Sequence, residues 1–230
     1  MTPLVLLPGM MCDARLWFSQ IAAFSSQRVV QTAPMNGADI SDIAIEILAD
    51  APPIFALAGL SMGGIVAMEL LRQAPERIER IALLDTNPLP ELPEVAVRRE
   101  PQIVKVQQGG LIAVMRDEMK PNYLADGPNR TAILDLCMDM AQTLGPEIFV
   151  AQSRALQTRP NQVETLKASK IPTLILCGRD DRLCPIGRHK LMYDLMPHAE
   201  FTIIEGAGHL PTLEQPTETT AALARWLEAL

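Results

Sequence analysis

The sequence lacks several features that would assign it to a specialised class of protein. It contains no cluster of Lys and Arg, and its 230 residues carry a formal net charge of −7, so duplex nucleic acid is not an expected partner. No apolar run approaches the length of a membrane span, and the apolar start of the chain has no basic segment of the kind that precedes a signal peptide. We therefore expect a soluble, cytoplasmic protein with no membrane partner.

Cysteine pairs, repeats and low-complexity tracts are also missing. The four cysteines form no C-x-x-C motif, which favours free thiols in a reducing compartment over a disulfide framework. Hydrophobic residues make up 48% of the chain and charged residues 20%, as in an ordinary globular protein. This length suits one large domain, or a domain with one insertion.

What the sequence does contain is an alternation of short apolar runs and helical patterns. Strands are expected at residues 4–7, 28–32, 54–60, 78–84, 172–177 and 201–204, and a last helix is expected to begin near Pro216. This β-α order predicts an α/β fold with a mainly parallel sheet and helices on both faces. The strands are apolar throughout rather than alternating, which fits burial on both sides.

Residues 88–165 interrupt the alternation. This segment shows helical spacing and no convincing strand, so we expect a core of residues 1–87 and 166–230 with a helical lid inserted between them. Insertions at the carboxyl edge of a parallel sheet usually cover a binding site. Methionines in the insertion are candidates for an apolar substrate-binding wall, with core packing as the alternative: Met115, Met119, Met138 and Met140.

A possible nucleophile lies in the motif Gly59-Leu60-Ser61-Met62-Gly63, between an expected strand and an expected helix. A tight strand-to-helix turn would expose the Ser61 hydroxyl, and small flanking residues would permit the close packing that such a turn requires. Free N–H groups at the start of the helix would favour developing negative charge. The alternative is a glycine-rich turn with an incidental serine.

A serine nucleophile needs a base, and the chain has three histidines. His189 is expected on the surface of a helix and His198 in a turn. His209 follows the last strand in a loop at the carboxyl end of the sheet, where Ser61 also lies. We therefore predict that His209 is the base.

The base in turn needs an acid to orient its second ring nitrogen. Asp181 follows the fifth expected strand, and the order Ser61, Asp181, His209 is the order expected for this fold. Asp180 is its neighbour, and Asp85 ends the fourth strand, so both remain alternatives.

These motifs together resemble those of the α/β-hydrolase superfamily. The resemblance covers nearly the whole chain except the insertion, and rests on Pro8-Gly9-Met10, Gly59-Leu-Ser-Met-Gly-Gly64, Gly178-x-x-Asp181-x-x-x-Pro185 and Gly208-His209. The family's acid sits three residues after the glycine, which implies Asp181. The family's leading β-hairpin has no counterpart before residue 4, so we expect about six strands. Pro8-Gly9 replaces the common His-Gly, but a backbone donor in this loop needs no histidine.

The resemblance implies a serine-nucleophile esterase or lactonase. We expect hydrolysis of a carboxylic ester, lactone or thioester of a small, fairly apolar acyl compound through an acyl-enzyme intermediate. The backbone N–H groups of Met10 and Met62 would stabilise the oxyanion, and no metal or organic cofactor is expected. Carbon–carbon bond hydrolysis and a non-catalytic ligand receptor are the alternatives. The sequence leaves the physiological substrate and the oligomeric state open.

Overall fold

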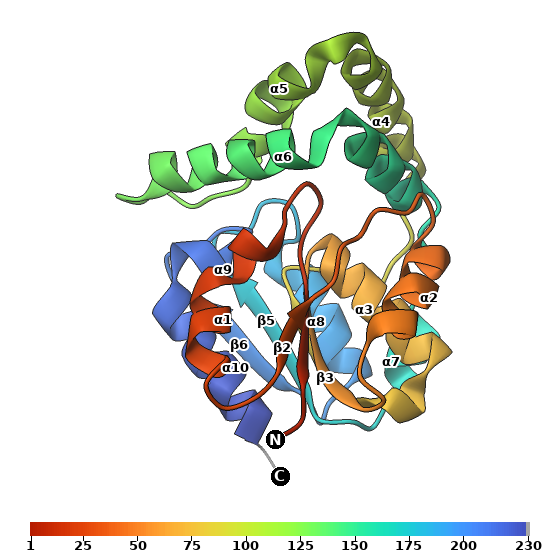
Figure 1. Cartoon of the computed structure of the whole chain (residues 1–230), viewed down its shortest axis with the longest axis vertical. Coiled ribbons are helices and arrows are strands. Elements are labelled where there is room, and N and C mark those ends of the chain that lie inside the picture. The colour runs from red at the N-terminus through yellow and green to blue at the C-terminus, as the bar shows by residue number, and fades with distance from the viewer. Residues whose placement is uncertain (229–230) are drawn as a thin grey trace.

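A six-stranded parallel sheet organises the computed structural model, which describes residues 1–228 (Figure 1). The strand order is β2-β1-β3-β4-β5-β6, and every neighbouring pair is parallel. The strands are β1 (Leu4–Leu7), β2 (Val30–Thr32), β3 (Phe55–Leu60), β4 (Ile78–Leu84), β5 (Thr173–Gly178) and β6 (Glu200–Ile204). The expected six-stranded α/β fold is confirmed, with strand ends shifted by one or two residues.

The continuous apolar runs arise because the central strands are covered on both faces. Every residue of β1, β3 and β5 is buried, whereas the edge strand β2 is only partly buried. Successive side chains of a strand point to opposite faces, so Val5 and Leu7 join one hydrophobic cluster and Leu4 and Leu6 join the other.

Helices cover the two faces of the sheet (Figure 1). The face containing Val5 and Leu7 packs against α2 (Ile40–Asp50), α3 (Met62–Gln73), α7 (Val163–Ala168) and α8 (Ile186–Leu195). The other face packs against α1 (Phe18–Phe24) and α10 (Pro216–Glu228), with the short α9 (Pro211–Glu214) beside them. Asp39 caps α2 by accepting from the backbone N–H groups of Ser41 and Asp42.

The helical insertion lies beyond the carboxyl ends of the strands (Figure 1). It contains α4 (Pro93–Lys105), η3 (Val106–Gly110), α5 (Leu111–Ala113), η4 (Val114–Met119), η5 (Lys120–Asn122) and the long α6 (Arg130–Gln157). Gly109 and Gly145 have φ of 89° and 85° and divide the helical segments. The expected boundary at residue 165 falls inside α7, whose Leu166 is buried against the core.

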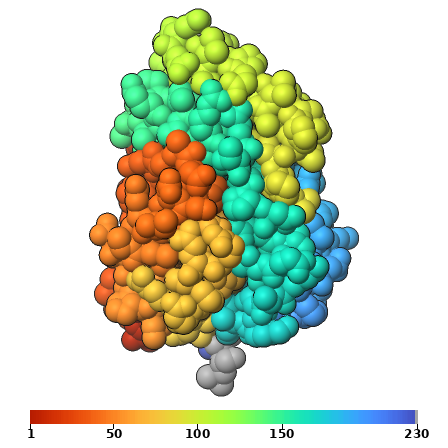
Figure 2. Space-filling view, turned by 90° about the vertical axis from the view of Figure 1, so that its right-hand side faces the viewer, coloured from red at the N-terminus to blue at the C-terminus, as the bar shows by residue number. Residues whose placement is uncertain are grey.

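The insertion packs directly on the core along one side of the molecule. In the space-filling view, its yellow-green and green residues continue without a break into the core surface below (Figure 2). Among residues 1–228, no helix is long and apolar enough to cross a membrane. All four cysteines are buried and free.

Candidate active site

Ser61 occupies a strained turn between β3 and α3. Its φ is 55°, in the left-handed region that non-glycine residues rarely adopt. The glycines around it are required by close backbone contacts, because a Cβ on Gly59 would lie 2.2 Å from the carbonyl oxygen of Gly63. A Cβ on Gly63 would lie 2.3 Å from the carbonyl oxygen of Leu7. The motif therefore holds the serine turn tightly against the first strand.

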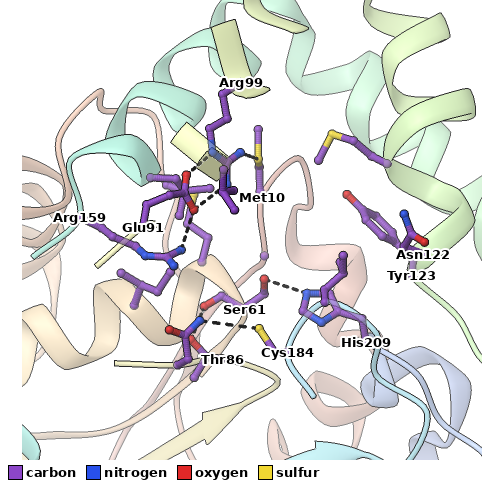
Figure 3. Close-up of a pocket in the computed structure, with 18 of the residues that line it drawn as sticks. Met10, Ser61, Thr86, Glu91, Arg99, Asn122, Tyr123, Arg159, Cys184 and His209 are labelled. Atoms are coloured by element: carbon purple, nitrogen blue, oxygen red, sulfur yellow. Dashed lines mark hydrogen bonds and ion pairs between the residues drawn. The ribbon is translucent and has the colours of Figure 1, made fainter. Parts of the chain in front are cut away.

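Three side chains from separate loops meet at this turn. His209 Nε2 lies 2.9 Å from Ser61 Oγ, and His209 Nδ1 lies 2.8 Å from Asp181 Oδ2 (Figure 3 shows the first contact). Asp181 Oδ1 accepts from the backbone N–H groups of Leu183 and Cys184, at 2.8 and 2.9 Å. The neighbouring Asp180 is exposed, so it does not compete for the imidazole.

Asp181 is ionised despite its burial. Burial opposes ionisation, but His209 and the hydrogen bonds from His209, Cys184 and Asp85 together lower the pKa of Asp181 to about 2. A buried carboxylate next to an imidazole fixes the ring's orientation and stabilises the protonated ring. The geometry therefore provides each group that a serine nucleophile needs.

Asp85 lies against Asp181 rather than His209. It is fully buried at the end of β4, and its Oδ1 accepts from the Gly178 N–H at 2.9 Å. Burial and the adjacent charge of Asp181 raise the pKa of Asp85 well above its ordinary value. The raised pKa favours the protonated, neutral form of Asp85 beside ionised Asp181.

The loop after β1 carries Met10, and α3 begins at Met62, the two residues whose N–H groups are predicted to form an oxyanion hole. Met10 and Met62 both line the cavity, and their N–H groups donate no backbone hydrogen bond to another described residue. Gln152 from α6 fixes this loop, since its Oε1 accepts from the Met11 N–H at 2.8 Å and its Nε2 donates to the Met35 carbonyl at 2.9 Å. The insertion therefore helps to position the loop.

Residues 4–223 match the Alpha/beta hydrolase family. The chain belongs to this family. A pimeloyl-[acyl-carrier protein] methyl ester esterase of Nitrosomonas europaea is 27% identical over 94% of this chain and 91% of that protein. A thermophilic esterase from Thermogutta terrifontis has a TM-score of 0.90 at 27% identity, covering 99% of this chain and 90% of that one. The enol-lactonase from Burkholderia xenovorans shares the fold, with a TM-score of 0.87 at 22% identity over 99% of this chain and 92% of that one.

His189 differs from its expected surface position in this α/β hydrolase. It is fully buried, and burial lowers its pKa to about 4, so the imidazole is neutral. Its Nε2 accepts from the Thr86 N–H at 3.2 Å, while Thr86 Oγ1 donates to the Ser61 carbonyl at 2.8 Å. His189 therefore supports the serine turn through Thr86. The helical pattern alone gave no sign of this contact.

Glu214 holds the loop that carries His209. Its Oε2 accepts from the N–H groups of Gly208 and Ala125 at 2.9 and 2.8 Å, and its Oε1 accepts from Leu210 at 3.0 Å. The His209 N–H donates to the Tyr123 carbonyl at 2.7 Å. Core and insertion thus both fix the position of His209.

A cavity of about 410 Å³ opens in front of Ser61 and His209. Of the four methionines proposed as its wall, Met119 lines it and the other three do not. Met115 and Met140 are fully buried in the two hydrophobic clusters, and Met138 packs beside one of them. Helical spacing identifies an apolar face but does not say which apolar residues reach the cavity.

Charged residues outside the predicted site also line the cavity. They are Arg98, Arg99, Arg159, Arg188, Glu91 and Glu118. The adjacent Arg98 and Arg99, near the start of the insertion, are the sequence feature that could have indicated this charged lining. Adjacent arginines on a helix are common, so the pair alone does not identify a site.

A metal could in principle use Asp181, Cys184 and His209, which place ligand atoms within 4.8 Å of one another in the described part of the chain. The chemistry of these donors fits a metal poorly. Both carboxylate oxygens of Asp181 already accept hydrogen bonds, and burial raises the pKa of the Cys184 thiol well above its usual value. The Asp181 carboxylate is already satisfied by the His209 ring and by the backbone N–H groups of Leu183 and Cys184.

Replacing each buried aspartate by asparagine should separate their roles. Asp181→Asn should lower kcat by roughly a thousandfold or more, because the amide cannot stabilise the imidazolium. Asp85→Asn should keep kcat within a few fold, since a neutral amide resembles the protonated acid and can still accept from the Gly178 N–H. Steady-state kinetics on one ester would test both. Comparable losses in the two variants would contradict the assignment.

Asp85 should also make stability depend on pH. An unfolded aspartate has a pKa of about 3.9, so above that pH the folded chain holds a proton on Asp85 that the unfolded chain releases. Wild-type stability should then fall relative to Asp85→Asn by about 1.4 kcal/mol per pH unit, until the folded-state pKa is reached. Denaturant unfolding of both proteins from about pH 5 to about pH 8 would measure this difference. Parallel stability curves would show that Asp85 ionises normally.

The methionines should divide into two groups. Met115→Ala and Met140→Ala should lower the free energy of unfolding by about 2–5 kcal/mol without changing substrate preference, because both side chains are buried away from the cavity. Met119→Ala should change the ratio of kcat/KM between short and long acyl chains by about tenfold. A chain-length series of esters, together with thermal unfolding, would compare the three. An unchanged preference in Met119→Ala would remove it from the substrate-binding wall.

Proposed function

We propose that this carboxylic ester hydrolase of the alpha/beta hydrolase family uses Ser61, His209 and Asp181 to cleave a small ester, lactone or thioester. The observation that carries the proposal is the pair of contacts from His209, 2.9 Å to Ser61 Oγ and 2.8 Å to Asp181 Oδ2, beside a cavity. A serine hydroxyl activated in this way attacks carbonyl carbon without a cofactor.

The first half of the reaction forms an acyl-enzyme. Ser61 Oγ attacks the substrate carbonyl as His209 Nε2 takes the hydroxyl proton, and Asp181 stabilises the resulting imidazolium. The N–H groups of Met10 and Met62 donate to the oxyanion of the tetrahedral intermediate. The intermediate then collapses, and His209 gives its proton to the leaving alcohol or thiol.

The second half repeats this chemistry with water. His209 accepts a proton from water as the water oxygen attacks the acyl carbon on Ser61. Collapse of the second tetrahedral intermediate releases the carboxylic acid and returns the proton to Ser61. The same oxyanion donors serve both steps, because the carbonyl oxygen occupies the same position in each.

The choice of bond is supported by the relatives. The relative from Nitrosomonas europaea is named as a methyl ester esterase and that from Thermogutta terrifontis as an esterase, and both are 27% identical to this chain. A carboxylic ester is therefore the bond we propose, with a lactone as the cyclic form of the same group. The cavity of about 410 Å³ suits a small substrate.

Ser61→Ala should fold normally and lose several orders of magnitude in kcat, because removing one member of the catalytic group disables the whole group. A fluorophosphonate probe should label wild type at Ser61, as intact mass and peptide mapping would show. Asp180→Asn is the matched control, because Asp180 is exposed beside Asp181 and should retain activity. Labelling at a different serine, or full activity in Ser61→Ala, would contradict the proposal.

A further inference from the structure

We propose that the substrate carries a carboxylate remote from the reacting ester, and that Arg99, Arg159 and Arg188 bind it in the cavity in front of Ser61. This inference rests on the proposed ester hydrolysis and names the substrate class of the same site. The observation behind it is an arginine cluster with too few acids to neutralise it.

Glu91 lies between two of these arginines, on one side of the cavity (Figure 3). Arg99 pairs with both carboxylate oxygens of Glu91, and Arg159 Nη1 lies 3.2 Å from Glu91 Oε1. The side chains of Glu91, Arg159 and Arg99 are only 3%, 13% and 15% exposed, so the pairs are largely removed from solvent. The guanidinium groups of Arg99 and Arg159 therefore already bind one carboxylate, that of Glu91.

Some N–H donors of the three arginines form no hydrogen bond with Glu91. Within residues 1–228, Arg99 Nη1 has only the thioether of Met10 as acceptor, at 3.8 Å, and a thioether sulfur accepts weakly. Arg159 Nε donates to the Leu89 carbonyl at 3.0 Å, which leaves Nη2 without a partner among the described residues. The Arg188 side chain makes no hydrogen bond or ion pair within residues 1–228, and it lines the same cavity.

The charge of the cluster is unbalanced. Three guanidinium groups face one carboxylate, and an arginine remains protonated in proteins. Burial lowers the pKa of Arg159 and the charge of Glu91 raises it, while the charges of Arg99 and Arg188 lower it again. Both arginines are therefore close enough to Arg159 to repel it. Glu118 also lines the cavity but pairs with Lys105 at 2.9 Å.

Burying a positive charge costs free energy unless a nearby anion compensates it. This local excess contrasts with the formal net charge of −7 for the whole chain. A carboxylate is the anion that fits, because planar guanidinium groups bind carboxylates through paired hydrogen bonds, as Glu91 shows. Met10 connects the two parts of the cavity, since its thioether contacts Arg99 and its N–H is a proposed oxyanion donor.

Two matched esters would test the inference. Monomethyl adipate and dimethyl adipate share the same reacting bond and chain length, but only the first carries a carboxylate. Wild type should prefer monomethyl adipate by about tenfold or more in kcat/KM, measured by methanol release. The ratio between the esters cancels any loss of folded enzyme.

Arginine variants would show whether the preference for the monoester depends on the arginine cluster. Arg188→Gln removes a charge without leaving a described partner unpaired, so it should fold and lower the ratio by about threefold or more. Arg159→Gln should lower it further. Arg116→Gln is the control, because Arg116 is exposed, pairs with Asp117 and does not line the cavity. An unchanged ratio in both Arg188→Gln and Arg159→Gln would overturn the proposal.

Binding measurements distinguish the proposed carboxylate site from the proposed ester hydrolysis. Calorimetry on Ser61→Ala should show monomethyl adipate binding about tenfold or more tightly than dimethyl adipate. Equal binding of the two esters would overturn the carboxylate site even if wild type hydrolyses both. Tighter binding of the monoester, with neither ester hydrolysed by wild type, would support the carboxylate site and contradict the proposed function.

Discussion

Close backbone packing around the Ser61 turn is the constraint on which the rest of the site depends. Gly63 approaches the Leu7 carbonyl so closely that any side chain would collide with it, which locks α3 against β1. Met11, Ser61 and Asp85 are the non-glycine residues with positive φ within 1–228, and each comes from a loop after one of three neighbouring strands. Strained residues at one edge of a sheet persist only where the surrounding structure enforces them.

Asp85 and Asp181 lie beneath this turn, and burial beside each other shifts their pKa values in opposite directions. Two fully ionised carboxylates could not be buried side by side at acceptable cost, so Asp85 stays neutral while Asp181 keeps its charge. The charge of Asp181 is then available to His209, while Asp85 accepts from the Gly178 N–H. Burial thus sets different roles for two residues of the same type.

The insertion contributes to both sides of the chemistry. Gln152 fixes the loop that carries Met10, the Tyr123 carbonyl and the Ala125 N–H help to hold the His209 loop, and Arg99 supplies part of the arginine cluster. Each contact joins residues far apart in the chain, so substitutions in the insertion can alter catalysis as well as substrate preference.

The sequence by itself determined the sheet and the positions of the serine, histidine and acid. Apolar runs mark buried strands because burial on both faces tolerates few polar side chains, and the glycines near Ser61 mark the turn because only they fit there. Choosing Asp181 over Asp85 needed the family resemblance, since both acids follow strands at the same edge of the sheet.

Only the tertiary structure decided which other side chains reach the site. Met119 lines the cavity while Met140 is buried elsewhere, although the same helical spacing suggested both. His189 is buried under the serine turn, and Arg159 meets Glu91 across 68 residues of sequence. Periodicity records which face of a helix is apolar, whereas contacts between distant segments depend on how the helices pack, and no local pattern encodes that.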